Sequence, residues 1–145
     1  MLSPLFIKIY TNQRDAILRD VLFFQLCLDH LGFLITEHDY EVRCDAPGGP
    51  DAYVEITFFN HANRITISAW KPYGLPTLNT IRSDRAEVGR ICDLENEHGD
   101  FSDAFARVHP LDALGECAVR RAYQDAVIAR ITKFGTCLRK NFGQL

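Results

Sequence analysis

Several residues of the chain have the types and the spacing of a metal site. Glu95 and His98 form an E-x-x-H pair, a pattern that supplies two of the ligands of di-iron centres in helical bundles. Such a centre needs a second E-x-x-H pair, and the chain has none. Cys92 with His98 is no better as a zinc pair, because no second pair of residues has ligand spacing. The sequence therefore predicts neither a metal site nor a bound cofactor.

Cysteine chemistry is the second possibility. The chain has five cysteines without a C-x-x-C pair, and we expect them to be reduced and structural. A nucleophilic Cys44 or Cys92 would need a base, and the histidines that only the fold could bring to it are His38, His61, His98 and His109. The alternation of the chain places Cys44 on the core side of a strand, where a reactive thiolate is unfavourable. We expect no enzymatic activity, and a small enzyme of unknown class is kept as an alternative.

The strands that would position a binding site lie between residues 37 and 70. Apolar and polar residues alternate there in three runs separated by turns rich in Gly, Pro and Asn, which predicts three antiparallel strands. We expect Phe59 to lie opposite Arg64 and Cys44 opposite Ala52. This register puts all the apolar positions on one face, and a slip by one residue would spoil that agreement.

The outward face of these strands is the strongest candidate for a binding surface. In the predicted register Tyr53 lies opposite Trp70, and Glu41 lies opposite Glu55, a like-charge pair that costs stability. Carboxylates beside exposed aromatic rings suit a partner that carries Arg or Lys side chains. The alternatives are that aromatic residues simply favour strands, or that the last helix covers this face.

A second acidic feature runs from residue 91 to residue 106, a stretch that contains no Lys or Arg. It could mimic phosphate or carboxylate and plug a basic active site, or it could be the solvated end of a helix and a loop. Together the two features give the predicted partner-binding residues: Asp39, Glu41, Tyr53, Glu55, Phe59, Trp70, Asp93, Glu95, Glu97 and Asp100.

The remaining elements complete a single domain over residues 1–145. In chain order we expect a short strand at Leu5–Tyr10, a helix from Thr11 or Asn12 to Gly32, an irregular segment at 71–79, a helix from Ser83 or Asp84 to near Gly99, a helical turn at 103–108, and a long helix whose apolar stripe runs from Val119 to Phe142. The fold class is α+β: an antiparallel three- to four-stranded β-meander packed with an N-terminal helix and two or three C-terminal helices.

Charge is unevenly distributed along the chain. Residues 1–116 hold 10 basic and 18 acidic side chains, whereas residues 117–145 hold six basic and one acidic. An acidic body disfavours nucleic acid and suits a basic protein partner. A basic last helix could touch nucleic acid or could complement the acidic body. The apolar runs are too short to span a membrane and the N-terminus has no signal-peptide order, so we expect a soluble, cytoplasmic protein.

In overall profile the chain resembles the immunity proteins of bacterial contact-dependent inhibition and other polymorphic-toxin systems. The resemblance rests on small size, an acidic α+β body and the lack of a catalytic constellation, and on no motif. It implies a monomer or weak dimer that binds one cognate toxin domain with a basic surface and occludes a functional part of it. A dimeric secretion-type chaperone, which would bind an extended segment, is a further alternative.

Overall fold

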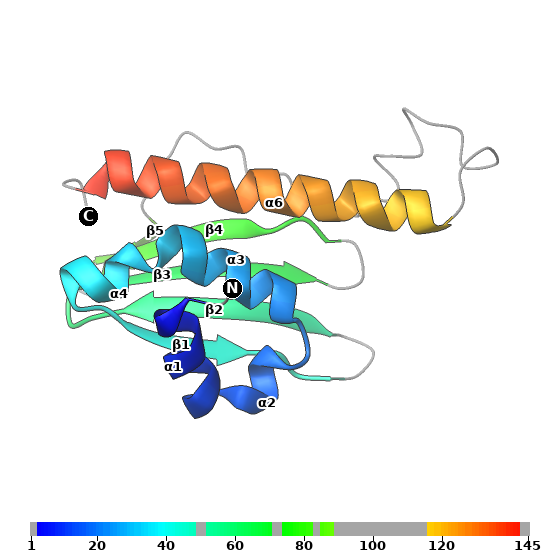
Figure 1. The fold of residues 1–145 in the computed structure, drawn as a ribbon. Coiled ribbons are helices and arrows are strands. Elements are labelled where there is room, and N and C mark those ends of the chain that lie inside the picture. Colours follow the sequence, from blue (N-terminus) through cyan, green and yellow to red (C-terminus); the bar gives the residue numbers. More distant parts are fainter. Residues whose placement is uncertain (1–2, 49–51, 71–73, 83–84, 89–115, 143–145) are drawn as a thin grey trace.

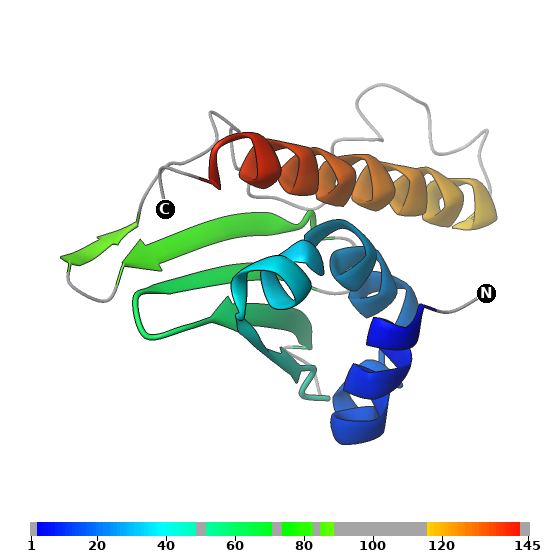
Figure 2. The ribbon, with the colours of Figure 1, turned by 60° about the vertical axis from the view of Figure 1, so that its left-hand side comes forward.

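The computed structural model describes residues 3–48, 52–70, 74–82, 85–88 and 116–142. Its centre is one antiparallel sheet of five strands in the order β1-β2-β3-β4-β5 (Figure 1). The described helices pack on one face of this sheet (Figure 2). This two-layer arrangement confirms the α+β class and the antiparallel meander.

The described chain opens with a helix where a strand was expected. α1 spans Pro4–Asn12. Ser3 caps it by accepting a hydrogen bond from the backbone N–H of Phe6, and Pro4 suits the first turn because no partner awaits its missing N–H. Phe6 and Ile9, three residues apart, turn into the core. The predicted N-terminal strand is wrong, because the cap and the apolar face outweigh the β-like composition of this run.

The helix predicted to end at Gly32 is broken. It is divided into α2 (Arg14–Ile17) and α3 (Val21–Leu31), and the Asp20 side chain caps α3 by accepting a hydrogen bond from a backbone N–H of its first turn. Gly32 follows α3 as predicted, and a Cβ at this position would meet the carbonyl oxygen of Leu28.

The chain then continues into α4 (Phe33–His38), which was not predicted. α4 ends at Asp39, whose φ of 58° lies in the left-handed region that Asp tolerates better than most residues. Asp39 therefore lies at the junction between helix and strand, and its predicted place in the first strand is wrong.

The three predicted strands are present as β1 (Glu41–Asp45), β2 (Tyr53–Phe59) and β3 (Asn63–Trp70), and β4 (Thr77–Arg82) follows them in the sheet. The predicted pairing of β2 with β3 is confirmed, since Phe59 lies opposite Arg64 and Tyr53 lies opposite Trp70. Asn60 accepts hydrogen bonds from the backbone N–H groups of two turn residues, which holds this hairpin closed.

The predicted pairing of β1 with β2 is wrong by four residues. Cys44 lies opposite Ile56 and not opposite Ala52. A slip by an even number keeps every side chain on its own face, so the apolar pattern cannot detect it. Pro47 and Pro50 lie in the connection, and each lacks the N–H that a tighter hairpin would have to donate.

The sheet extends further than the sequence predicted. β4 begins at Thr77, inside the segment expected to be irregular, and pairs with β3. β5 (Arg85–Val88) then pairs with β4, so the helix predicted to start at Ser83 or Asp84 is wrong over these four residues. Its capping pattern is local, and strand pairing with β4 overrides it. The rest of that helix and the turn at 103–108 lie outside the described residues.

The long last helix is confirmed. α6 spans Glu116–Lys140, and its described buried residues are Tyr123, Val127, Ile131, Phe134 and Leu138. It packs beside α3, where a Cβ on Gly135 would lie only 2.8 Å from the backbone oxygen of His30. Neither α6 nor any other helix of the described residues is long and apolar enough to cross a membrane.

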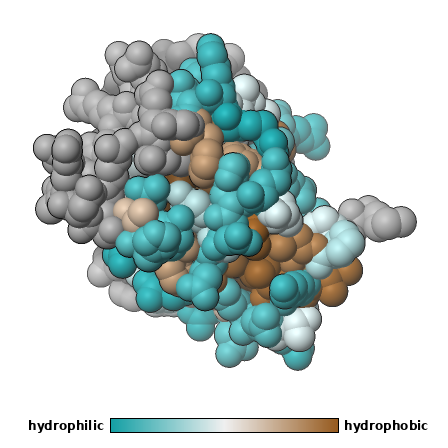
Figure 3. All heavy atoms as spheres, turned by 90° about the vertical axis from the view of Figure 1, so that its left-hand side faces the viewer, coloured by the Kyte–Doolittle hydropathy of each residue, from teal (hydrophilic) through white to brown (hydrophobic). Residues whose placement is uncertain are grey.

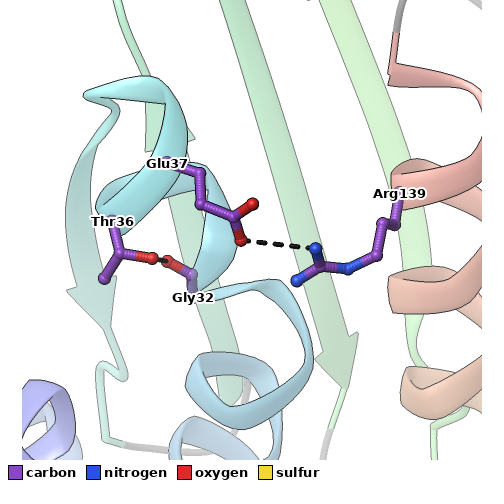
Figure 4. A network of polar contacts seen from close by, with 4 residues as sticks. All are labelled: Gly32, Thr36, Glu37 and Arg139. Carbon is purple, nitrogen blue, oxygen red and sulfur yellow. Dashed lines mark hydrogen bonds and ion pairs between the residues drawn. The ribbon is translucent and has the colours of Figure 1, made fainter.

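The end of α6 is fastened to α4 by Arg139. Its guanidinium lies 4.2 Å from the ring centroid of Phe33. The same group lies 3.3 Å from the carboxylate of Glu37, and Figure 4 draws this ion pair. Beyond the helix, the Phe142 ring stacks on His38 with 3.7 Å between centroids. The exposed ion pair adds little stability, so ring packing holds this end of the helix.

The outer edge of β1 is closed by a side chain. The amide of Gln13, between α1 and α2, donates a hydrogen bond to the carbonyl oxygen of Val42 (2.9 Å) and accepts one from the backbone N–H of Cys44. Arg19 donates to the carbonyl oxygen of Ala46, one residue past β1 (2.8 Å). Gln13 thus makes the two contacts that a neighbouring strand would make, and it protects the edge from other strands.

Candidate protein-binding site

The face of β1–β4 that points away from the described helices is called the outer face here. Its described residues form three cross-strand rows and one terminal pair. In order along the sheet these are Glu41, Phe59 and Arg64; Arg43, Thr57, Thr66 and Asn79; Asp45, Glu55, Ser68 and Thr77; and Tyr53 with Trp70. The row through Thr57 is uncharged apart from Arg43, so the acidic and aromatic residues divide between the two ends.

The last row places two carboxylates side by side. Asp45 lies opposite Glu55, so the predicted pairing of Glu41 with Glu55 is wrong and Asp45 takes its place. The hydroxyl of Tyr53 donates a hydrogen bond to Asp45 Oδ2 (3.2 Å), and that of Thr57 donates to Glu55 Oε1 (3.4 Å). Each carboxylate therefore accepts a hydrogen bond from a neighbouring hydroxyl group, and neither forms an ion pair with a described residue.

The predicted aromatic pair is next to these carboxylates. The rings of Tyr53 and Trp70 meet edge to face, with 5.5 Å between centroids and an interplanar angle of 61°. The Asp45 carboxylate is the main cause that raises the pKa of the Tyr53 hydroxyl, ahead of burial and of the charge of Glu55. Trp70 is 61% exposed, the most exposed large apolar side chain among the described residues. We call Asp45, Tyr53, Glu55 and Trp70 the acidic-aromatic corner.

The other predicted binding residues lie elsewhere. Glu41 and Phe59 face each other at the opposite end of the outer face, about 20 Å from Tyr53 at ~3.3 Å per residue along β2. Asp39 is off the sheet, at the end of α4. The remaining predicted residues, Asp93, Glu95, Glu97 and Asp100, lie outside the described part of the chain. The structure therefore brings together Tyr53, Glu55 and Trp70.

Asp45 is the member of the corner that the sequence prediction missed. It directly precedes the Pro- and Gly-rich connection and was left out of the predicted strand, because the expected pairing of Cys44 with Ala52 made the hairpin too tight. The two prolines of this connection are the sequence signal that would have identified Asp45. With Pro47 and Pro50 unable to donate, a wider loop leaves Asp45 as the last paired residue of β1.

The thiols of the described core do not provide a nucleophile. Burial raises the pKa of Cys44 to about 12, and burial raises the pKa of Cys27 well above its usual value of 9.0. A thiol with a raised pKa stays protonated and unreactive at neutral pH. His38, a predicted candidate base, is engaged in its stack on Phe142. Among the described residues no group of three His, Cys, Asp or Glu side chains could hold a metal ion.

One cysteine departs from the expected reduced state. Cys137, on α6, is disulfide-bonded, whereas Cys27 and Cys44 are free. The expectation that all the cysteines are reduced is therefore wrong for this structure. Disulfides form and persist in oxidising surroundings.

A second, apolar surface lies on the helical side. In Figure 3, which views the molecule from the left-hand side of Figure 1, apolar side chains gather at the lower right. At the end of α2 and the start of α3, Leu18, Val21 and Leu22 are further large apolar side chains that are exposed. Exposed apolar area by itself does not identify the chemistry of a partner.

The chain matches no known family model, no curated protein and no solved structure. The argument for its function therefore rests on the chemistry of the described residues, and the acidic-aromatic corner has the most specific chemistry among them.

Proposed function

We propose that this chain is a small protein-binding domain, an immunity protein that binds and neutralises a cognate bacterial toxin domain. The observation that carries the proposal is Trp70, an exposed ring beside Tyr53 and beside two carboxylates that form no ion pair with a described residue. Tryptophan and tyrosine dominate the energy of protein interfaces. The carboxylates suit a toxin with a basic surface, which they would attract and orient.

The framework of the corner supports a binding role. Its four residues stand on neighbouring strands whose inner faces are packed into the core, so the rings lose little freedom when a partner docks. The proposed domain works without a cofactor or metal, as a monomer or weak dimer. The charge of the corner disfavours nucleic acid as the partner.

The test is capture of a partner by the tagged full-length chain, co-expressed with the product of the adjacent gene. We expect one stoichiometric protein that survives a moderate salt wash and is toxic when expressed alone. Trp70→Ala is expected to weaken its binding by about 30-fold or more, as for an interface anchor. Ile128→Ala is the matched control, because Ile128 is an exposed apolar residue on α6, in the helical layer, and its loss should leave binding unchanged.

The outcomes separate clearly. Capture of the same protein by wild type and by the Trp70→Ala variant with equal affinity would remove the corner from the interface. Absence of any captured protein under co-expression would contradict the immunity role itself.

A further inference from the structure

Resting on the proposed function, we infer that the acidic-aromatic corner binds one arginine side chain of the partner protein. The guanidinium would lie between the carboxylates of Asp45 and Glu55, with its plane against the exposed ring of Trp70.

The first step is electrostatic. Asp45 and Glu55 occupy directly opposed positions on β1 and β2, where like charges repel each other. No described cation forms an ion pair with either of them. A partner's positive charge placed between them would remove the repulsion and gain two charge-assisted hydrogen bonds.

The second step is orientation. Tyr53 and Thr57 donate hydrogen bonds to the two carboxylates (3.2 and 3.4 Å), which fixes the acceptor oxygens before a ligand arrives. A carboxylate offers several lone-pair sites, so each oxygen pair can accept further hydrogen bonds. The corner therefore presents acceptors from two strands that converge on one position.

The third step distinguishes arginine from lysine. Trp70 leaves most of its ring in solvent while Tyr53 supports its other side edge to face. A planar guanidinium can stack on such a ring and bind carboxylates in its own plane at the same time, whereas an ammonium cannot combine these two geometries as well.

The chain's own Arg43 does not take this place. It lies one row away on β1, opposite Thr57, and it forms no ion pair with Asp45 or Glu55. Arg43 lowers the pKa of the Tyr53 hydroxyl, but this effect is smaller than the opposing effect of Asp45. The local field at the corner stays negative.

The probe is the blocked tripeptide acetyl-Gly-Arg-Gly-amide, titrated at constant ionic strength into the full-length chain. Trp70 is the only tryptophan of the chain, so its fluorescence reports the corner alone. We expect a saturable change with a Kd on the order of 10 mM, the affinity of one side chain. The lysine tripeptide should bind at least about threefold more weakly, and the citrulline tripeptide, which keeps the shape but lacks the charge, should give no saturable change.

The matched variant is Asp45→Asn with Glu55→Gln, which removes both charges and keeps the side-chain shapes. It should weaken binding of the arginine tripeptide at least about threefold, and intact circular dichroism would show that it folds. Equal binding of the arginine and citrulline peptides, or equal binding by wild type and the double variant, would overturn the inference.

The partner assay separates this inference from the proposed function. Capture lost with Trp70→Ala but unchanged with Asp45→Asn and Glu55→Gln would refute the arginine site while the interface stands. Capture weakened by both supports the inference. A positive peptide titration without any captured partner would support the chemistry of the corner and contradict the immunity role.

Discussion

The buried thiol of Cys44 links a single residue to the pH dependence of the stability of the protein. Burial raises the pKa of Cys44 from its ordinary value of 9.0 to about 12. Unfolding returns the thiol to water, where it ionises near its ordinary value. Between pH 9 and 12 the unfolded state therefore releases a proton that the folded state keeps, and stability falls as pH rises through this window.

The corresponding prediction concerns the Cys44→Ala variant. Its free energy of unfolding, measured by urea denaturation at pH 8 and at pH 10.5, should fall less between the two values than that of the wild type. The comparison isolates Cys44 because all other groups titrate in both proteins. Equal losses in the two proteins would show that Cys44 is not buried as described.

For single residues, the sequence predicted which residue types lie on the outer face better than it predicted which residues lie opposite each other. Tyr53 and Trp70 were placed opposite each other correctly, because the short Asn60–Asn63 turn leaves one register. Asp45 was missed and Glu41 was misplaced by the same slip. Each residue of β1 kept its predicted face of the sheet. The residues on the outer face were therefore predicted correctly, but their cross-strand partners on β2 were not.

At the scale of elements, the closed edge of β1 depends on Gln13. Its side chain satisfies a carbonyl oxygen and an N–H that otherwise face outward from the sheet. Gln13→Ala is expected to lower the free energy of unfolding by about 1–3 kcal/mol, the cost of leaving such groups without partners. It should also promote self-association, because an open strand edge accepts other strands.

Urea denaturation and light scattering at several protein concentrations measure the two effects. Asn12→Ala is the control, since Asn12 is an exposed neighbour without a described contact to the strand. A Gln13→Ala variant as stable and as monomeric as the control would show that the edge is protected by other means.

The elements also show what local sequence signals leave out. The stripe of α6 was recognised because seven spaced apolar residues leave no alternative to a long helix. The run at α1 was mistaken for a strand, and β5 was mistaken for a helix start. In both cases a few residues fit either structure, and packing against distant elements decides between them.

At the scale of the whole molecule, the structure shows how the acidic body and the basic last helix are arranged. The acidic body and the basic last helix meet where Arg139 of α6 contacts Glu37 of α4. The helix lies on the inner side of the sheet with the others (Figure 2), so the alternative that it covers the outer face is wrong. The outer face thus keeps its acidic end apart from the basic helix.

The disulfide at Cys137 bears on where the protein works. We expect that alkylation of the denatured chain without reductant modifies Cys27 and Cys44 and leaves Cys137 unmodified, and that reduction makes Cys137 reactive. Mass spectrometry of protein trapped with iodoacetamide at cell lysis identifies the modified residues. Five reactive thiols in the trapped wild type would place the chain in a reducing compartment and contradict the disulfide.

The central claim is that the partner docks over Trp70, and 5-fluorotryptophan labelling tests it most directly. The single tryptophan gives one fluorine resonance even when the unlabelled partner has tryptophans of its own. The account predicts that this resonance shifts when the complex forms and loses its sensitivity to the exchange of H2O for D2O, because the ring leaves solvent. An unchanged resonance in a fully formed complex would contradict it and place the interface on another face.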